Sequence, residues 1–198
     1  LPRKALGLPQ TGPIVLMQGA GINVNRGAEE ALEAMQWVSP RAYLVFVGDG
    51  DVVGELKEQA KQLQLNHRVI FIPKVPFEQL ASYTRLASIG LSLDKPNNLN
   101  YQNSLPNKLF DYIHAGVPVL VSEIYEVAKV VRNYGIGEVL ESHDPQKMAQ
   151  ALNQMLEELE IQNPYEKGLE RAREELTWQK ECEVLDRVYD PLIKSGSQ

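Results

Sequence analysis

The chain is poor in the residues that build several common kinds of functional site. Its 198 residues include one cysteine and three histidines. The lone Cys182 excludes an internal disulfide framework and a cysteine-based zinc site, and it is typical of a protein from a reducing compartment. The histidines, at positions 67, 114 and 143, have no partner four residues away, so we expect no histidine-based metal site. We therefore expect a cytoplasmic protein that uses no metal and no cofactor.

Positive charge is also scarce. The chain has 20 Lys and Arg against 26 Asp and Glu, a formal net charge of −6. Because a general nucleic-acid binder needs a basic excess to displace phosphate counterions, we expect no nucleic-acid partner. No apolar run is long enough to span a membrane, and no signal peptide opens the chain. The chain begins at Leu1 without Met, so we expect a fragment of a longer protein, in which residues of another domain are not visible.

Several nucleotide-binding and catalytic motifs are missing or incomplete. Gly19-x-Gly21 follows the first apolar run, but Val24 stands where a dinucleotide-binding motif needs its third glycine. No Asp precedes Asp49, which excludes the acidic cluster of a phosphoacceptor receiver domain. A Walker-type phosphate loop is absent, and neither Ser104 nor Ser122 lies in a G-x-S-x-G elbow.

Short apolar runs alternate with helical patterns over most of the chain. The runs predict strands at residues 13–18, 42–47, 68–72, 89–93, 119–122 and 137–140. Helices are predicted at 26–37, 52–65, 77–87, from about 106 to 115, and at 125–132. Because the runs are continuously apolar, the fold class is α/β, a doubly wound parallel sheet of about six strands covered on both faces. Ligands of such sheets bind outside the carboxyl ends of the strands.

The pattern becomes purely helical towards the C-terminus, with helices predicted at 145–159, 165–175 and 178–190. Pro191 is expected to end the last of these. The sequence thus predicts a Rossmann-like domain over 13–160, a C-terminal helical extension over 161–193, and a disordered tail over 194–198.

The stretch 103–121 is the most informative in the chain. It predicts a polar loop, a helix that starts near Pro106 and stops at Gly116, and then a buried strand. Lys108 and Asp111 fall on the first turns of this helix, where free N–H groups favour a negatively charged ligand. Arg26 opens the earlier helix at 26–37, where its guanidinium could reach phosphate oxygens in the Gly19–Gly21 loop. This order suits a diphosphate-linked ligand.

These residues together resemble the C-terminal, nucleotide-sugar-binding domain of retaining GT-B glycosyltransferases, glycosyltransferase group 1. The resemblance spans about residues 13–156 and follows the family's order of motifs. Its elements are Arg26-Gly27, Val47-Gly48-Asp49-Gly50, Val69-Ile70-Phe71-Ile72-Pro73-Lys74-Val75, and Asp111-Tyr112-Ile113-His114-Ala115-Gly116-Val117-Pro118-Val119. Asp111 stands at the second Glu of the family's Glu-x7-Glu motif, and Asn103 stands at the first. Ala20 stands where many members carry a further basic residue.

The resemblance implies a role for each candidate residue. Arg26 and Lys108 would neutralise the diphosphate, and Asp111 would accept hydrogen bonds from the ribose hydroxyls. Gly19 and Gly21 would let the backbone approach the ligand closely, and Lys74 and Val75 would lie beside the base. Asn103 would touch the transferred sugar, and the backbone N–H groups of Ser104 and Leu105 would face the distal phosphate and the sugar. Arg26, Lys108 and Asn103 are the candidates for catalysis.

The implied function is transfer of a sugar from a nucleoside diphosphate sugar donor to an unidentified acceptor, with retention. The family binds its acceptor in an N-terminal domain that this chain lacks, so the chain alone should bind donor without turnover. Any peripheral membrane association is expected to run through that absent domain. Two alternatives stay open from the sequence: half of a sugar-nucleotide 2-epimerase, or a nucleotide-binding or docking module in which Asn103 marks a degenerate site.

Overall fold

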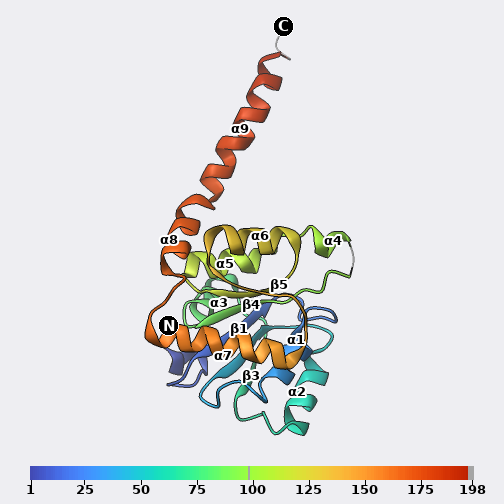
Figure 1. Cartoon of the computed structure of the whole chain (residues 1–198). Coiled ribbons are helices and arrows are strands. Elements are labelled where there is room, and N and C mark those ends of the chain that lie inside the picture. Colours follow the sequence, from blue (N-terminus) through green and yellow to red (C-terminus); the bar gives the residue numbers. More distant parts are fainter. Residues whose placement is uncertain (98, 196–198) are drawn as a thin grey trace.

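Six parallel strands form one sheet in the order β3-β2-β1-β4-β5-β6 (Figure 1). The computed structural model describes residues 1–97 and 99–195. The strands are β1 (Ile14–Gly19), β2 (Tyr43–Gly48), β3 (Val69–Ile72), β4 (Ile89–Ser92), β5 (Val119–Ser122) and β6 (Gly137–Leu140). Each agrees with a predicted strand to within one residue at either end, and the doubly wound parallel sheet is confirmed.

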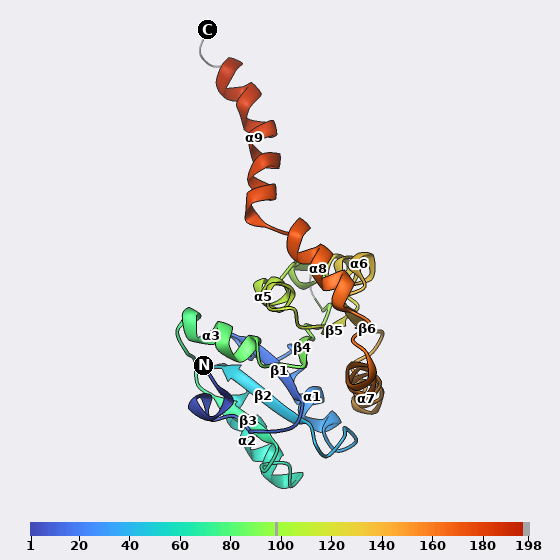
Figure 2. The same cartoon turned by 90° about the vertical axis from the view of Figure 1, so that its left-hand side faces the viewer.

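Helices cover both faces of the sheet. They are α1 (Ala28–Ala34), α2 (Val53–Gln62), α3 (Phe77–Thr84), α4 (Leu99–Gln102), α5 (Asn107–Ala115), α6 (Tyr125–Tyr134), α7 (Pro145–Ile161), α8 (Glu166–Glu175) and α9 (Trp178–Ser195), with a 3₁₀ turn η1 (Arg3–Leu6) before the sheet. α1, α2 and α7 lie on one face, and α3, α5 and α6 lie on the other (Figures 1 and 2). No helix among the described residues combines the length and apolarity that crossing a bilayer requires.

The strand order reverses between β1 and β4. β1 pairs with β2 from Ile14 to Gly19 and with β4 through Val15 and Leu16. The first crossovers lie on one face of the sheet and the later ones on the other, so the connections leaving β1 and β4 separate at their carboxyl ends. This edge is where an open α/β sheet forms its ligand crevice.

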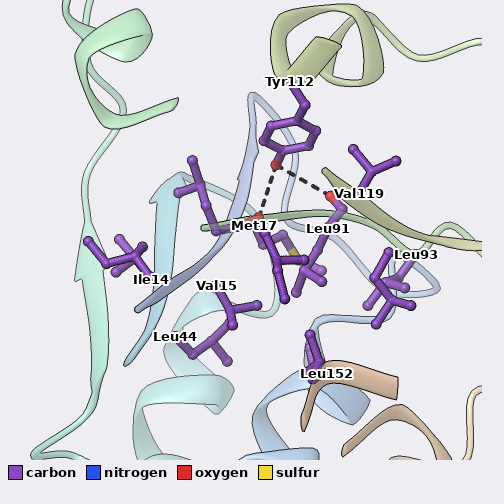
Figure 3. Close-up of a cluster of buried hydrophobic side chains, with 14 of the residues drawn as sticks. Ile14, Val15, Met17, Leu44, Leu91, Leu93, Tyr112, Val119 and Leu152 are labelled. Carbon is purple, nitrogen blue, oxygen red and sulfur yellow. Dashed lines mark hydrogen bonds between the residues drawn. The ribbon is translucent and has the colours of Figure 1, made fainter. Parts of the chain in front are cut away.

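The core places α5 firmly on the sheet. The Tyr112 ring is completely buried and points from α5 at β1 and β4, while Leu152 of α7 covers the opposite face (Figure 3). A Cβ atom at Gly90 of β4 would lie only 2.5 Å from the Tyr112 ring, so the ring needs a glycine beneath it. Tyr112 thereby fixes the helix that carries Lys108 and Asp111.

The helices predicted at 26–37, 52–65 and 77–87 each end three residues earlier than expected, and two further boundaries differ in ways that bear on the argument. α1 begins at Ala28, after Gly27 at a φ of +74°, so Arg26 precedes the helix instead of opening it. α9 continues through Pro191 to Ser195, because a proline removes one backbone donor while its neighbours can keep helical dihedral angles. Residues 194 and 195 of the predicted disordered tail belong to α9, and 196–198 lie outside the described residues.

α9 extends away from the body of the domain (Figures 1 and 2). Its exposed large apolar side chains are Trp178, Val184, Leu185, Val188 and Tyr189. These side chains leave apolar surface of the last helix uncovered in the described part of the chain. The domain boundaries at 160 and 193 remain predictions.

Candidate functional site

The loop after β1 is fastened at several points along the carboxyl edge of the sheet. Four hydrogen bonds from backbone N–H groups hold it in the described part of the chain: from Ile22 to the Asp49 carbonyl at 2.8 Å, from Val24 to Asp51 Oδ1 at 3.1 Å, from Asp51 to Asn23 Oδ1 at 3.2 Å, and from Lys95 to the Asn25 carbonyl at 2.9 Å. The last bond connects the loop to the residues that follow β4. The chain therefore brings residue 26 to the junction of β1 and β4.

Gly27 allows this close approach. Its φ of +74° is a conformation that L side chains rarely adopt, and a Cβ atom there would lie 2.5 Å from Leu93 Cβ. The Arg26-Gly27 pair thus combines a cation with the one residue type that lets its backbone pass against the end of β4.

Arg26 meets Lys108 at a buried carboxylate. Arg26 Nη1 lies 2.8 Å from Asp94 Oδ1, and Lys108 Nζ lies 3.6 Å from Asp94 Oδ2. Tyr101 of α4 stacks on the guanidinium, whose central carbon lies 4.6 Å from the ring centroid. The three charged groups come from the loop after β1, the end of β4 and the first turn of α5. Two cations and one carboxylate leave a net positive charge at the edge of the sheet.

Burial makes this cluster sensitive to charge. Burial lowers the pKa of Lys108, and the nearby Arg26 lowers it further, while Asp94 acts in the opposite direction. Arg26 Nε and Asp94 Oδ2 are buried without a hydrogen-bond partner in the described part of the chain. The arrangement is that of an anion site, since cations with unused donors at a helix N-terminus stabilise phosphate oxygens.

Asp111 lies one turn further along α5 and is bound by a buried amide. Gln18 Nε2 donates to Asp111 Oδ2 at 3.1 Å, and Gln18 Oε1 accepts from Thr84 Oγ1 at 2.7 Å. The Thr84 hydroxyl also lies 3.0 Å from the Leu80 carbonyl, and the Gln18 amide lies between this hydroxyl and the carboxylate. Burial raises the pKa of Asp111 above its ordinary value, and the bond from Gln18 and the nearby His114 oppose that rise.

One cavity reaches this carboxylate, and a second cavity shares part of its lining. One, of about 250 Å³, is lined by Asp111, Thr84 and His114 among others. The other, of about 220 Å³, is lined by Gly19, Lys74 and Val75 among others. Phe77 and Leu80 of α3 line both. The structure thus brings the residues predicted for the ribose and for the base to one groove beside α3.

Of the remaining predicted residues, Asn103 and Ser104 form hydrogen bonds to backbone carbonyls of the preceding turn. Asn103 Nδ2 donates to the Leu99 carbonyl at 3.0 Å, and the Ser104 N–H donates to the Tyr101 carbonyl at 3.3 Å. Leu105 is an exposed side chain next to them. Gly21 lies in the fastened loop, where a Cβ atom would come within 3.1 Å of the Asn23 side chain.

Asp94 and Gln18 are site residues that the sequence analysis missed. Asp94 directly follows the fourth apolar run, so the rule that ligands bind at the carboxyl ends of strands could have found it. Gln18 is a polar residue at the end of an otherwise apolar strand, which is a weaker signal. Among the residues that the structure describes, no group of three His, Cys, Asp or Glu side chains is placed to hold a metal ion.

Comparison with known proteins identifies the family. The family model for glycosyl transferases group 1 matches residues 2–185. The chain belongs to this family. A D-inositol 3-phosphate glycosyltransferase from Xylanimonas cellulosilytica is 24% identical over 201 residues, which cover 97% of this chain and 45% of that protein.

Solved glycosyltransferase structures share the fold. Sucrose-phosphate synthase from Thermosynechococcus elongatus matches 98% of this chain and 48% of its own with a TM-score of 0.77 and 23% identity. HepE from Anabaena, in complex with UDP and glucose, matches 93% of this chain and 51% of its own with a TM-score of 0.77 and 17% identity. The chain therefore has the Rossmann-like fold of one half of a GT-B glycosyltransferase, and it spans about half the length of these relatives.

Proposed function

We propose that this chain is the donor-binding domain of a glycosyltransferase that moves a sugar from a nucleoside diphosphate sugar to an acceptor with retained anomeric configuration. The observation that carries the proposal is the convergence of Arg26 and Lys108 at the N-terminus of α5, beside the junction of β1 and β4. The UDP complex of HepE, a protein of the same fold, supports a nucleoside diphosphate as the ligand.

The chemistry follows from the charge of the leaving group. A diphosphate leaves with its negative charge, so an enzyme accelerates transfer by placing cations and N–H donors where that charge develops. Arg26 and Lys108 supply the cations and the first turn of α5 supplies donors. Asp111 binds the ribose hydroxyls with the carboxylate oxygen that Gln18 does not occupy, and the groove at Lys74 and Val75 takes the base. Asn103, Ser104 and Leu105 lie on the side of the transferred sugar.

The acceptor would bind to the half of the enzyme that this chain lacks. The chain covers 45% of its inositol-phosphate glycosyltransferase relative, which leaves room for a second domain. On this proposal the isolated chain binds the donor but does not turn it over, and any contact with a membrane runs through the other domain. The proposed location of the protein is the cytoplasm, where nucleotide sugars are available to it.

Isothermal titration with UDP, GDP, dTDP and their sugar conjugates tests donor binding. We expect one of these diphosphates to bind and Arg26→Ala to weaken it. An isolated chain that binds none of them would overturn the proposal. Retention is tested separately by joining the chain to its missing domain and determining the anomeric configuration of the product by NMR.

One observation favours a second candidate, a docking module without catalysis. Asn103 stands where the family has its first Glu, and its amide is bonded to the Leu99 carbonyl within α4. The same titrations separate the two functions, because a docking module with a degenerate site should not distinguish a sugar conjugate from the bare diphosphate. Asn103→Glu would then improve binding of the conjugate if the site retains its donor geometry.

A further inference from the structure

Asp94 connects the two cations of the phosphate site. Its Oδ1 pairs with Arg26 at 2.8 Å and its Oδ2 faces Lys108 at 3.6 Å. We propose that Asp94 is a positioning residue that holds Arg26 and Lys108 together as a preformed cationic pair for the diphosphate. This inference rests on the proposed function and adds to it a residue whose negative charge favours the binding of an anion.

The burial of Asp94 shows that its charge depends on these partners. Its side chain is 1% exposed, whereas the side chains of Arg26 and Lys108 are 29% and 13% exposed. An ionised carboxylate withdrawn from water is costly unless it is paired with opposite charge. The carboxylate therefore lies beneath the two cations, and both cations retain an accessible side that can meet a ligand.

The two contacts differ in a way that suits a ligand. The Arg26 contact is a hydrogen bond that fixes the plane of the guanidinium, and Tyr101 covers one face of that plane. The distance to Lys108 exceeds that of a hydrogen bond, so attraction of charge holds the ammonium without a directional bond. The ammonium hydrogens can thus turn to phosphate oxygens without breaking a hydrogen bond to Asp94.

Asp94 also keeps like charges together. Arg26 and Lys108 repel one another, and burial favours the neutral form of the lysine. Asp94 is the carboxylate that faces both, with Tyr101 facing Arg26 from α4 and Asp111 one turn away on α5. Without it, Arg26 would lose its carboxylate partner and Lys108 would lose its proton more readily.

The direction in which Asp94→Asn changes the affinity for an anion shows whether Asp94 positions the cations or only lies near them. Asp94→Asn removes a negative charge beside an anion site, so a passive Asp94 predicts equal or tighter binding of inorganic pyrophosphate and of UDP. Positioning predicts instead that both bind about tenfold more weakly or worse, the scale of one lost charge-assisted hydrogen bond. Glu123→Gln is the matched control, since it removes the carboxylate partner of Arg132 on an exposed surface, and it should leave both affinities unchanged.

A double-mutant cycle tests whether Asp94 acts through Arg26. In an Arg26→Ala background, Asp94→Asn should weaken pyrophosphate binding much less than it does in the wild type, because one of the two cations that it positions is gone. A full additional loss in that background would show a general structural effect and overturn the proposal. The pH profile supplies a further readout, because Asp94→Asn should move the loss of binding at alkaline pH to lower pH as Lys108 deprotonates sooner.

A second variant covers the case in which Asp94→Asn does not fold. Asp94→Glu keeps the charge but moves the carboxylate by one methylene, so positioning predicts weaker pyrophosphate binding with an unchanged pH profile. Wild-type affinity in a folded Asp94→Glu protein would contradict it. A wild-type chain that binds neither pyrophosphate nor any nucleoside diphosphate would instead refute the proposed function itself.

Discussion

The hydroxyl of Tyr112 donates a hydrogen bond to the backbone carbonyl of Leu16 at a distance of 3.0 Å. The same oxygen accepts from the N–H of Gln18 at 3.3 Å. One side chain of α5 is thereby bound to β1 on both sides of Met17, directly before the loop that leads to Arg26. The helix that carries Lys108 and Asp111 and the strand that carries Gln18 consequently hold a fixed relative position.

Gly90→Ala should disturb this position. Its Cβ atom would come within 2.5 Å of the Tyr112 ring, and both residues are fully buried. We expect a loss of about 1–3 kcal/mol in the free energy of unfolding, the range for an overpacked core, together with weaker diphosphate binding as α5 shifts. Chemical denaturation and calorimetry measure the two effects.

Gly54→Ala is the control for that substitution. Gly54 lies in α2, and a Cβ atom added there would have no atom within 4 Å apart from the adjacent residues and the backbone of its own helix. Alanine is the better helix former, so this variant should be more stable by about 0.4–1 kcal/mol and should bind as the wild type does. Equal destabilisation of both variants would contradict the role given to the Gly90–Tyr112 contact.

Arg26→Ala should weaken binding of a nucleoside diphosphate by roughly 1.5–3 kcal/mol, the scale of a hydrogen bond to a charged group. The variant leaves Asp94 buried beside Lys108 alone, so part of the loss reflects that carboxylate. Arg132→Ala removes an arginine whose side chain is 56% exposed in a pair with Glu123, and it should have no effect. An unchanged affinity in Arg26→Ala would place the phosphate site elsewhere.

Asp111→Asn should reduce the preference for ribose. The amide still accepts from Gln18 through its oxygen but offers less acceptor capacity to the ribose diol. Binding of UDP should fall more than binding of 2′-deoxy-UDP, which each calorimetric titration compares within one variant. Equal losses for both nucleotides would refute the ribose assignment.

The same carboxylate gives a pH dependence of stability with a definite sign. Because burial raises the pKa of Asp111 in the folded chain, the folded state binds this proton more tightly than the unfolded state does. Protonation therefore adds stability at acidic pH, and that contribution is lost as the pH rises through the folded pKa. Asp111→Asn should flatten this part of the curve in denaturation experiments across mildly acidic pH, and an unchanged slope would contradict the shift.

The apolar face of α9 should make the isolated chain self-associate. Leu185 is 42% exposed and Tyr189 is 56% exposed on this helix. The double variant Leu185→Lys with Tyr189→Lys should lower the apparent mass in sedimentation velocity at high concentration. Glu183→Lys, on another side of α9, is the control for added positive charge. We propose that a second domain of the kind that the longer relatives have room for covers this face, so adding such a domain in trans should also suppress self-association.

The sequence predicted the fold well because each buried strand is a continuous apolar run with a polar or glycine-rich end. Recognisable motifs also drew attention to Arg26, Lys108 and Asp111; the structure brings Arg26 and Lys108 together at Asp94, and the binding roles of all three residues stay predictions. The sequence analysis did not predict Asp94, because a single acidic residue after a strand is common. Only the folded chain shows that Asp94 lies beneath two cations. Gln18 escaped for a related reason, because its role depends on Thr84, 66 residues away. The continuation of α9 past Pro191 shows that a proline, although it disfavours helix locally, does not always end a helix.

The fastened loop after β1 has a consequence for the thermodynamics of association. Its backbone is already ordered by bonds to Asp49, Asp51 and Lys95. A ligand that contacts this loop therefore does not have to immobilise a flexible segment. The entropic cost of ordering the loop on binding is consequently small. We expect diphosphate binding to show a small unfavourable conformational entropy, and amide hydrogen exchange at Ile22 and Val24 to be slow before any ligand is added.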